Sequence, residues 1–212
     1  MQSKSYKTIK NTVENTTVIE RSKFICYMKG VDNEDDAKEF IGLIRKQNSL
    51  ATHNCYAYVA DEFGLIQKFS DDGEPQGTTG LPMLEALKSS GLSKVVCVVT
   101  RYFGGVKLGT GGLVRAYGGA VLECIKNSKI INVFMSKIVE ITSDYDNYSK
   151  LLKLLSNENY SILETNFSDK IVLRVAIKEE SFVDFVEKIQ DLYKGKQLIR
   201  ESGEKYVSFG DV

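Results

Sequence analysis

The chain has 212 residues, of which 42% are hydrophobic and 26% are charged, close to the averages for globular proteins. Because domains cluster near roughly 100–150 residues, this length allows one large domain or two ordinary ones. The 28 basic and 28 acidic residues give a net charge of zero, which excludes a polycation that coats nucleic acid without selectivity.

The cysteine and histidine content argues against metal or disulfide staples. The four cysteines have no C-x-x-C spacing and lie in or beside apolar runs, so we expect free, buried thiols. A single histidine makes a zinc site unfavourable. No stretch approaches the roughly 20 apolar residues that cross a bilayer, and residues 1–10 lack the apolar core of a signal peptide. We therefore expect a soluble, cytoplasmic protein with no membrane partner.

The N-terminal region predicts strands followed by a helix. Residues 1–30 contain β-branched and aromatic runs that predict extended structure. Asp32 or Asn33 can cap a helix to about Gln47, because apolar residues recur there at helical spacing.

A hairpin and a short helix come next. Residues 53–60 and 65–69 predict two paired strands with Gly64 at their turn. After a polar loop, a helix is expected to begin near Pro82, where a missing N–H costs nothing, and to end at Gly91.

The central region combines a buried strand, a glycine-rich loop and a helix. Residues 95–99 are continuously apolar and β-branched, which predicts a strand buried on both faces. A helix is expected over residues 113–128, with Gly118 and Gly119 in its middle. Each glycine costs roughly 1 kcal/mol relative to alanine, so we expect close packing against another backbone there.

The last third predicts a strand–helix–strand–strand–helix–strand order, which is the ferredoxin-like split βαβ arrangement. We therefore predict an α+β protein with domains over residues 1–132 and 133–212. The expected elements cover residues 133–142, 145–157, 161–167, 170–177, 180–193 and 197–207.

The glycine-rich loop has the composition of a phosphate cradle. Glycine lets backbone N–H groups approach a ligand closely, and a helix N-terminus presents unpaired donors and partial positive charge. Nearby cations add full charges and guanidinium donors. The alternative is that the glycines serve only turns and packing. The candidate anion-binding or RNA-binding residues are Arg101, Gly104, Gly105, Lys107, Gly109, Gly111, Gly112 and Arg115.

A carboxylate cluster precedes this loop. Asp71, Asp72 and Glu74 could hold Mg²⁺ with help from phosphate oxygens, or supply a general base. They could equally cap the following helix and pair with the arginines. His53 becomes a candidate acid or base if the hairpin brings it close to this loop. No other cofactor is expected.

Four blocks of the sequence together resemble the YigZ/IMPACT family. They are residues 70–80 (SDDGEPQGTTG), 100–118 (TRYFGGVKLGTGGLVRAYG), 51–57 (ATHNCYA) and 22–24 (SKF). Thr79 stands where the family pattern has alanine. The resemblance covers the whole chain. It implies a first domain that resembles domain IV of elongation factor G and a ferredoxin-like second domain that resembles domain V.

The resemblance also carries functional expectations. It implies a suspected role in translation, with RNA or the ribosome as partner and a translation-regulatory protein as a further candidate partner. We therefore favour a non-catalytic protein that contacts RNA or the ribosome through the glycine- and arginine-rich surface. The alternative is a magnesium-dependent enzyme that acts on a phosphorylated small molecule or nucleotide. A third possibility is a protein-interaction module whose glycines serve only the fold.

Overall fold

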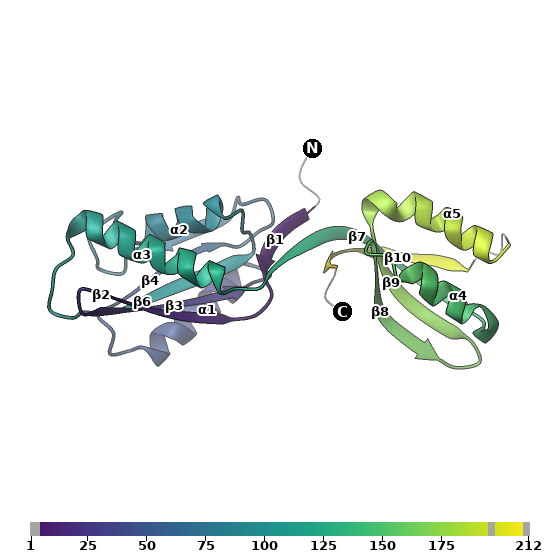
Figure 1. Ribbon diagram of the computed structural model, residues 1–212, viewed down its shortest axis with the longest axis horizontal. Helices are drawn as coiled ribbons and strands as arrows, with labels where there is room; N and C mark the ends of the chain where they lie inside the picture. Colours follow the sequence, from purple (N-terminus) through teal and green to yellow (C-terminus); the bar gives the residue numbers. More distant parts are fainter. Residues whose placement is uncertain (1–4, 195–197, 210–212) are drawn as a thin grey trace. The chain divides into compact units, whose positions relative to one another are not determined.

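The computed structural model describes residues 5–194 and 198–209. The chain divides into two compact units, Met1–Ile131 and Asn132–Val212, and each has its own hydrophobic core (Figure 1). The predicted α+β class with two domains is confirmed. Within the described residues, no helix is both long and apolar enough to cross a membrane.

The first unit is built around a five-stranded antiparallel sheet. Its strand order is β2-β3-β6-β4-β5. The central strand β6 is buried at seven of its eight positions, so the expectation of a strand buried on both faces is confirmed. The bounds are β2 Val13–Ile19, β3 Ser22–Gly30, β4 His53–Val59, β5 Gln67–Ser70 and β6 Val95–Tyr102; a short strand β1, Ser5–Ile9, precedes them.

Helices cover both faces of this sheet, which is why β6 is apolar on both sides (Figure 1). Helix α1 (Glu34–Gln47) packs on one face, and α2 (Gly80–Ser89) and α3 (Gly109–Lys126) pack on the other. Of the two predicted N-caps of α1, Asn33 is the one used. Its side chain accepts hydrogen bonds from the backbone N–H groups of Asp35 and Asp36.

Two helix starts differ from the prediction. Helix α2 begins at Gly80 rather than near Pro82, and α3 begins at Gly109, four residues before the predicted Leu113. The apolar pattern locates only the buried turns of a helix, and the first turn of α3 consists of polar or small residues. The last part of the predicted glycine loop, residues 109–112, is therefore the first turn of a helix.

The second unit has the predicted βαββαβ order. Its antiparallel strand order is β10-β7-β9-β8, and α4 and α5 pack against the sheet in one core, as the ferredoxin-like arrangement requires. Gln197, predicted to open the last strand, lies outside the described residues. The bounds are β7 Ile130–Ser143, α4 Tyr145–Leu155, β8 Tyr160–Phe167, β9 Ile171–Lys178, α5 Phe182–Leu192 and β10 Ile199–Ser208, with a 3-10 turn at Glu179–Ser181.

Candidate functional site

Three neighbouring strands bring the unusual sequence blocks together at one end of the first unit. In the registers of β3 with β6 and of β4 with β6, Arg101 lies opposite both Phe24 and His53. Residues directly opposite each other in a sheet share a face. Arg101 therefore lies between Phe24 and His53 on the sheet face that α2 and α3 cover.

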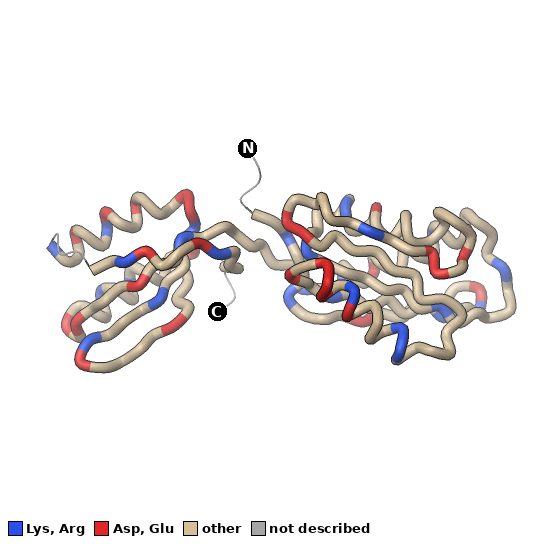
Figure 2. The backbone as a smooth tube through the Cα atoms, turned by 180° about the vertical axis from the view of Figure 1, so that it is seen from behind, with Lys and Arg blue, Asp and Glu red and all other residues tan. Residues whose placement is uncertain are grey.

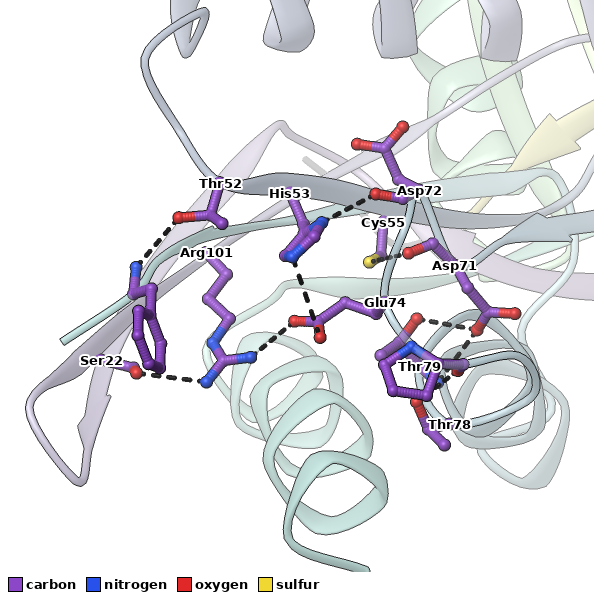
Figure 3. Close-up of polar contacts among 12 residues, drawn as sticks. Ser22, Thr52, His53, Cys55, Asp71, Asp72, Glu74, Thr78, Thr79 and Arg101 are labelled. Carbon is purple, nitrogen blue, oxygen red and sulfur yellow. Dashed lines mark hydrogen bonds and ion pairs between the residues drawn. The ribbon is translucent and has the colours of Figure 1, made fainter. Parts of the chain in front are cut away.

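The centre of this cluster is a buried ion pair (Figure 3). Arg101 Nη1 lies 2.7 Å from Glu74 Oε1, and the two side chains are only 6% and 5% exposed. The hydroxyl of Tyr117, from α3, donates to the same Glu74 oxygen at 2.9 Å. Arg101 Nη2 donates to Ser22 Oγ at 3.3 Å, whereas Arg101 Nε is buried without a partner among the described residues. Strands β3 and β6, the 70–80 loop and α3 thus meet at one carboxylate.

This burial corrects the phosphate-binding role predicted for Arg101. Its guanidinium faces Glu74 and Ser22 and stacks 5.3 Å from the ring centroids of Phe24 and Phe103. A buried guanidinium paired with a carboxylate has no free charge to offer an external phosphate. Arg101 stabilises the cluster instead.

His53 lies beside the same carboxylate, as the hairpin prediction allowed. Its Nδ1 is 2.8 Å from the backbone oxygen of Asp72, and a carbonyl oxygen only accepts, so Nδ1 carries the proton. Its Nε2 then faces Glu74 Oε2 at 3.9 Å, and the side chain is 21% exposed. The hydrogen bond from the His53 ring to Asp72 therefore holds the 70–80 loop against β4.

Asp71 holds the start of α2 in place. Its carboxylate accepts hydrogen bonds from the N–H groups of Gly77, Thr79 and Gly80 and from the Thr79 hydroxyl, at 2.8 to 3.1 Å. Partial burial is the largest influence on the pKa of Asp71 and opposes ionisation, but these hydrogen bonds together outweigh it and lower the pKa. Thr79, the departure from the family pattern, supplies two of them, and the one from its hydroxyl would be absent with alanine.

The three carboxylates do not converge, so the structure does not bring the candidate magnesium ligands together. Asp72 accepts from Arg45 Nη2 at 2.5 Å and from the N–H of Asn54 at 2.7 Å. Asp71 faces the start of α2, and Glu74 faces Arg101. No group of three or more His, Cys, Asp or Glu side chains suited to a metal ion occurs among the described residues. The other alternative from the sequence fits the structure: Asp71 caps α2, and Asp72 and Glu74 each pair with an arginine.

The nearby thiol is not set up as a nucleophile. Cys55 donates to the backbone oxygen of Asp71 at 3.0 Å, and burial raises the pKa of Cys55 to about 12. Only a thiolate attacks efficiently. All four cysteines are free and buried, as predicted.

The glycines of the central loop have different roles. The N–H of Gly104 donates to Ser22 Oγ at 3.1 Å, and a Cβ at Gly104 would lie 2.0 Å from the backbone oxygen of Arg21. Gly104 therefore serves the close approach of two chain segments, which corrects its predicted role as a phosphate donor. Gly105 and Gly109 have φ of +87° and +68°, so the chain needs glycine there to reach the start of α3.

Lys107 and Arg115 are the candidates that remain accessible. Both are exposed, and neither has a hydrogen-bond or ion-pair partner within residues 5–194 and 198–209. Together with Gly112 they line a surface cavity of about 550 Å³ at the start of α3. The first turn of α3, which includes the exposed Gly109 and Gly111, has no side-chain cap, so its N–H groups are available to a ligand.

The charge around this cavity is local rather than part of a broad basic face. Figure 2 shows basic and acidic positions interspersed along the chain of both units. Glu20 also lines the cavity. The site therefore has two free cations within a nearly neutral surface.

Sequence reasoning missed several members of the buried cluster. Tyr117 lies at an apolar position of its helix, although its hydroxyl contacts Glu74. Arg45 was not singled out, yet it pairs with Asp72. Ser22 belonged to a block noted for its resemblance, but the serine hydroxyl itself was not considered. A polar atom on a residue of an otherwise buried helix face is the signal that could have identified Tyr117.

Comparison with known proteins gives the family. Residues 20–125 match the model of the Impact N-terminal domain, and residues 141–196 match a domain of unknown function, DUF1949. The IMPACT family member YvyE of Bacillus subtilis is 41% identical over 203 residues, which cover 96% of this chain and 94% of that relative. The chain belongs to the IMPACT family. The resemblance noted in the sequence is thereby confirmed.

Other relatives share both units. The IMPACT family member YigZ of Escherichia coli is 35% identical over 181 residues, covering 84% of this chain and 88% of YigZ. A crystal structure described as that of a hypothetical protein aligns over 99% of both chains with a TM-score of 0.61 and 29% identity. The Impact N-terminal match contains every residue of the buried cluster, from Ser22 to Tyr117.

Proposed function

We propose that this IMPACT family protein acts in translation by binding RNA, free or in the ribosome, through the phosphate-binding surface formed by Lys107, Arg115 and the first turn of α3. The observation that carries the proposal is that both cations lack partners in the part of the chain that the structure describes and line the same cavity as Gly112. Unpaired cations beside an uncapped helix N-terminus favour an anionic ligand.

The buried cluster supports this surface indirectly. The ion pair of Arg101 with Glu74, together with Gly104, fixes the end of β6, from which the loop runs to α3. A loop anchored in this way presents Lys107 and the α3 amides with little loss of conformational freedom when a ligand binds. In this proposal Arg101 anchors the loop, whereas Lys107 and Arg115 contact the ligand.

The proposal predicts salt-dependent binding of a labelled, structured RNA hairpin to the full chain. Each phosphate contact adds roughly 0.7 to 0.9 to the slope of log K against log salt concentration. The double variant Lys107→Ala/Arg115→Ala should lower RNA affinity about tenfold at low salt and reduce that slope by about two. Fluorescence anisotropy over a series of salt concentrations measures both quantities.

A matched control removes two other exposed cations of the same unit. Lys38 and Lys46 lie on α1, on the opposite face of the sheet, so Lys38→Ala/Lys46→Ala should leave affinity and slope nearly unchanged. Equal losses in the two double variants would show only nonspecific attraction. Absence of binding by the wild type at low salt would refute the proposal.

A further inference from the structure

The edge of the first sheet at β2 is open. In the described part of the chain β2 pairs only with β3, so its outer backbone N–H and C=O groups have no strand partner. Edge strands are usually protected by charges, prolines or bulges. The β2 sequence, Val-Glu-Asn-Thr-Thr-Val-Ile, has one charge and no proline, and it consists mainly of β-branched residues that favour strand pairing.

A groove runs along this open edge. A cavity of about 490 Å³ is lined by Thr17 and Ile19 of β2 and by Ala116, Gly119 and Ala120 of α3, among other residues. It shares Ile19, Ala116 and Arg115 with the cavity at the start of α3, so the two hollows are continuous. Most of the groove lining is apolar, and a strand added at β2 would place alternate side chains in it.

Gly119 is a glycine without a structural reason within the described chain. At its neighbour Gly118, an added Cβ would lie 3.7 Å from Pro82 of α2, an ordinary contact distance, so the predicted close packing does not itself require glycine there. A Cβ at Gly119 would meet nothing within 4 Å, although glycine inside a helix costs about 1 kcal/mol relative to alanine. The close packing predicted at Gly119 is therefore wrong for the described chain, and the missing side chain leaves this part of the groove open.

The charges indicate what kind of strand fits. At the Ile19 end of the groove, Arg115 and Lys107 are exposed and unpaired, whereas Lys126 farther along α3 is already paired with Glu123 at 2.5 Å. The groove contains no aromatic side chain on which a nucleic-acid base could stack. Apolar walls, free backbone groups and cations at one end match a polypeptide better than a nucleic acid.

We propose that β2 and α3 form a docking site for an extended peptide of a partner protein, which adds a strand at the β2 edge. The peptide has apolar or β-branched residues at alternate positions and a carboxylate at the end that reaches Arg115. Backbone hydrogen bonds provide affinity and the groove provides specificity, as in other cases of strand addition. This inference goes beyond the RNA-binding function and does not depend on it.

The test is selection of a phage-displayed random heptapeptide library on the full-length protein, followed by titration of the best synthetic peptide. Gly119→Trp should place its ring in the groove, because a Cβ at this position meets nothing within 4 Å, and should weaken peptide binding at least about tenfold. Arg115→Glu should weaken it to a similar extent by repelling the peptide carboxylate. The matched control is Gly42→Trp, since Gly42 is also a helical glycine with open space, but on α1.

The outcomes separate the possible occupants. Enriched peptides that carry a terminal Asp or Glu and lose affinity only in Gly119→Trp and Arg115→Glu support the docking site. Failure to enrich peptides, or equal affinity in Gly119→Trp and Gly42→Trp, overturns it. A wild-type dimer in sedimentation equilibrium that Gly119→Trp makes monomeric also overturns it, because the edge then binds a second copy. RNA binding should persist in Gly119→Trp, so failure of either proposal can be recognised separately.

Discussion

Arg101 is a charged residue whose position is determined by three strands and one loop. Because it lies opposite Phe24 and His53, its side chain must either be buried under α3 or distort the sheet, and Glu74 with Ser22 makes burial possible. Removing one partner of a buried pair leaves the other charge uncompensated, which is far more costly than the loss of an exposed pair.

Arg101→Met should therefore lower the free energy of unfolding by about 3–5 kcal/mol, because Glu74 remains buried without a cation. Chemical denaturation followed by circular dichroism measures the change. As a control, Lys38→Ala removes the exposed contacts with Glu34 and Asp35 and should leave the free energy of unfolding nearly unchanged. Equal effects of the two substitutions would contradict the buried ion pair.

Asp71 predicts a pH dependence of stability. Its pKa in the folded protein lies below its unfolded value of about 3.9, so the unfolded state binds more protons as the pH falls. The stability that Asp71 contributes is complete above the unfolded pKa and is lost as the pH falls through the folded pKa.

Asp71→Asn should thus be less stable than the wild type at pH 7 and should lose less stability between about pH 5 and pH 2. Thermal unfolding at several pH values measures this. Glu85→Gln, at an exposed position of α2, is the control and should retain the wild-type profile. A parallel profile for Asp71→Asn and the wild type would show that the hydrogen bonds do not affect the protonation of Asp71.

The environment of single residues could be predicted where it follows from the neighbouring sequence. It could not be predicted where it depends on contacts between distant segments. Four free, buried cysteines followed from their apolar surroundings. The roles of Arg101 and Glu74 depended on the register of three strands that are distant in sequence. No local pattern could choose between a phosphate and a carboxylate as the partner of Arg101, although carboxylate pairing was one of the two alternatives considered.

At the level of elements, the junction of β6 with α3 depends on a close approach of two turns. Gly104 touches the backbone at Arg21, in the turn between β2 and β3, where Glu20 and Arg21 themselves have φ of +46° and +64°. Non-glycine residues in this region are strained. This turn therefore keeps two non-glycine residues at positive φ, and one of them, Glu20, lines the same cavity as Lys107 and Arg115.

Gly104→Ala should destabilise the protein by about 1–3 kcal/mol, because its Cβ overlaps backbone atoms that cannot rotate away. Gly42→Ala, in the open middle of α1, should instead stabilise by about 0.5–1 kcal/mol. Urea denaturation of both variants measures the difference. A neutral Gly104→Ala would mean that this glycine does not fix the loop.

The elements themselves were largely predictable, because long periodic segments determine them. The βαββαβ order of the second unit was correct, since each apolar period there is separated by clear turns. The starts of α2 and α3 were wrong because glycine, threonine and leucine at a helix start carry no distinct periodic signal. The start of α2 is set by the hydrogen bonds from Thr79 and Gly80 to the Asp71 carboxylate, and the sequence does not reveal those bonds.

At the scale of the whole molecule, one sequence block contains both residues that stabilise the fold and residues that are exposed for binding. Arg101, Glu74 and Gly104 stabilise the first unit, whereas Lys107 and Arg115 are free to contact a ligand. Sequence alone identified the block and, through the family, the two-domain organisation. Sequence alone could not tell the buried Arg101 from the exposed Lys107 and Arg115, because their exposure depends on packing between distant segments.

The most direct test compares RNA affinity and unfolding free energy in the same variants, under conditions where all remain folded. We predict that Arg101→Met loses about 3–5 kcal/mol of stability yet keeps most of its RNA affinity, whereas Lys107→Ala/Arg115→Ala keeps its stability and loses about tenfold in affinity. If folded Arg101→Met loses RNA binding and Lys107→Ala/Arg115→Ala does not, the division of roles is contradicted.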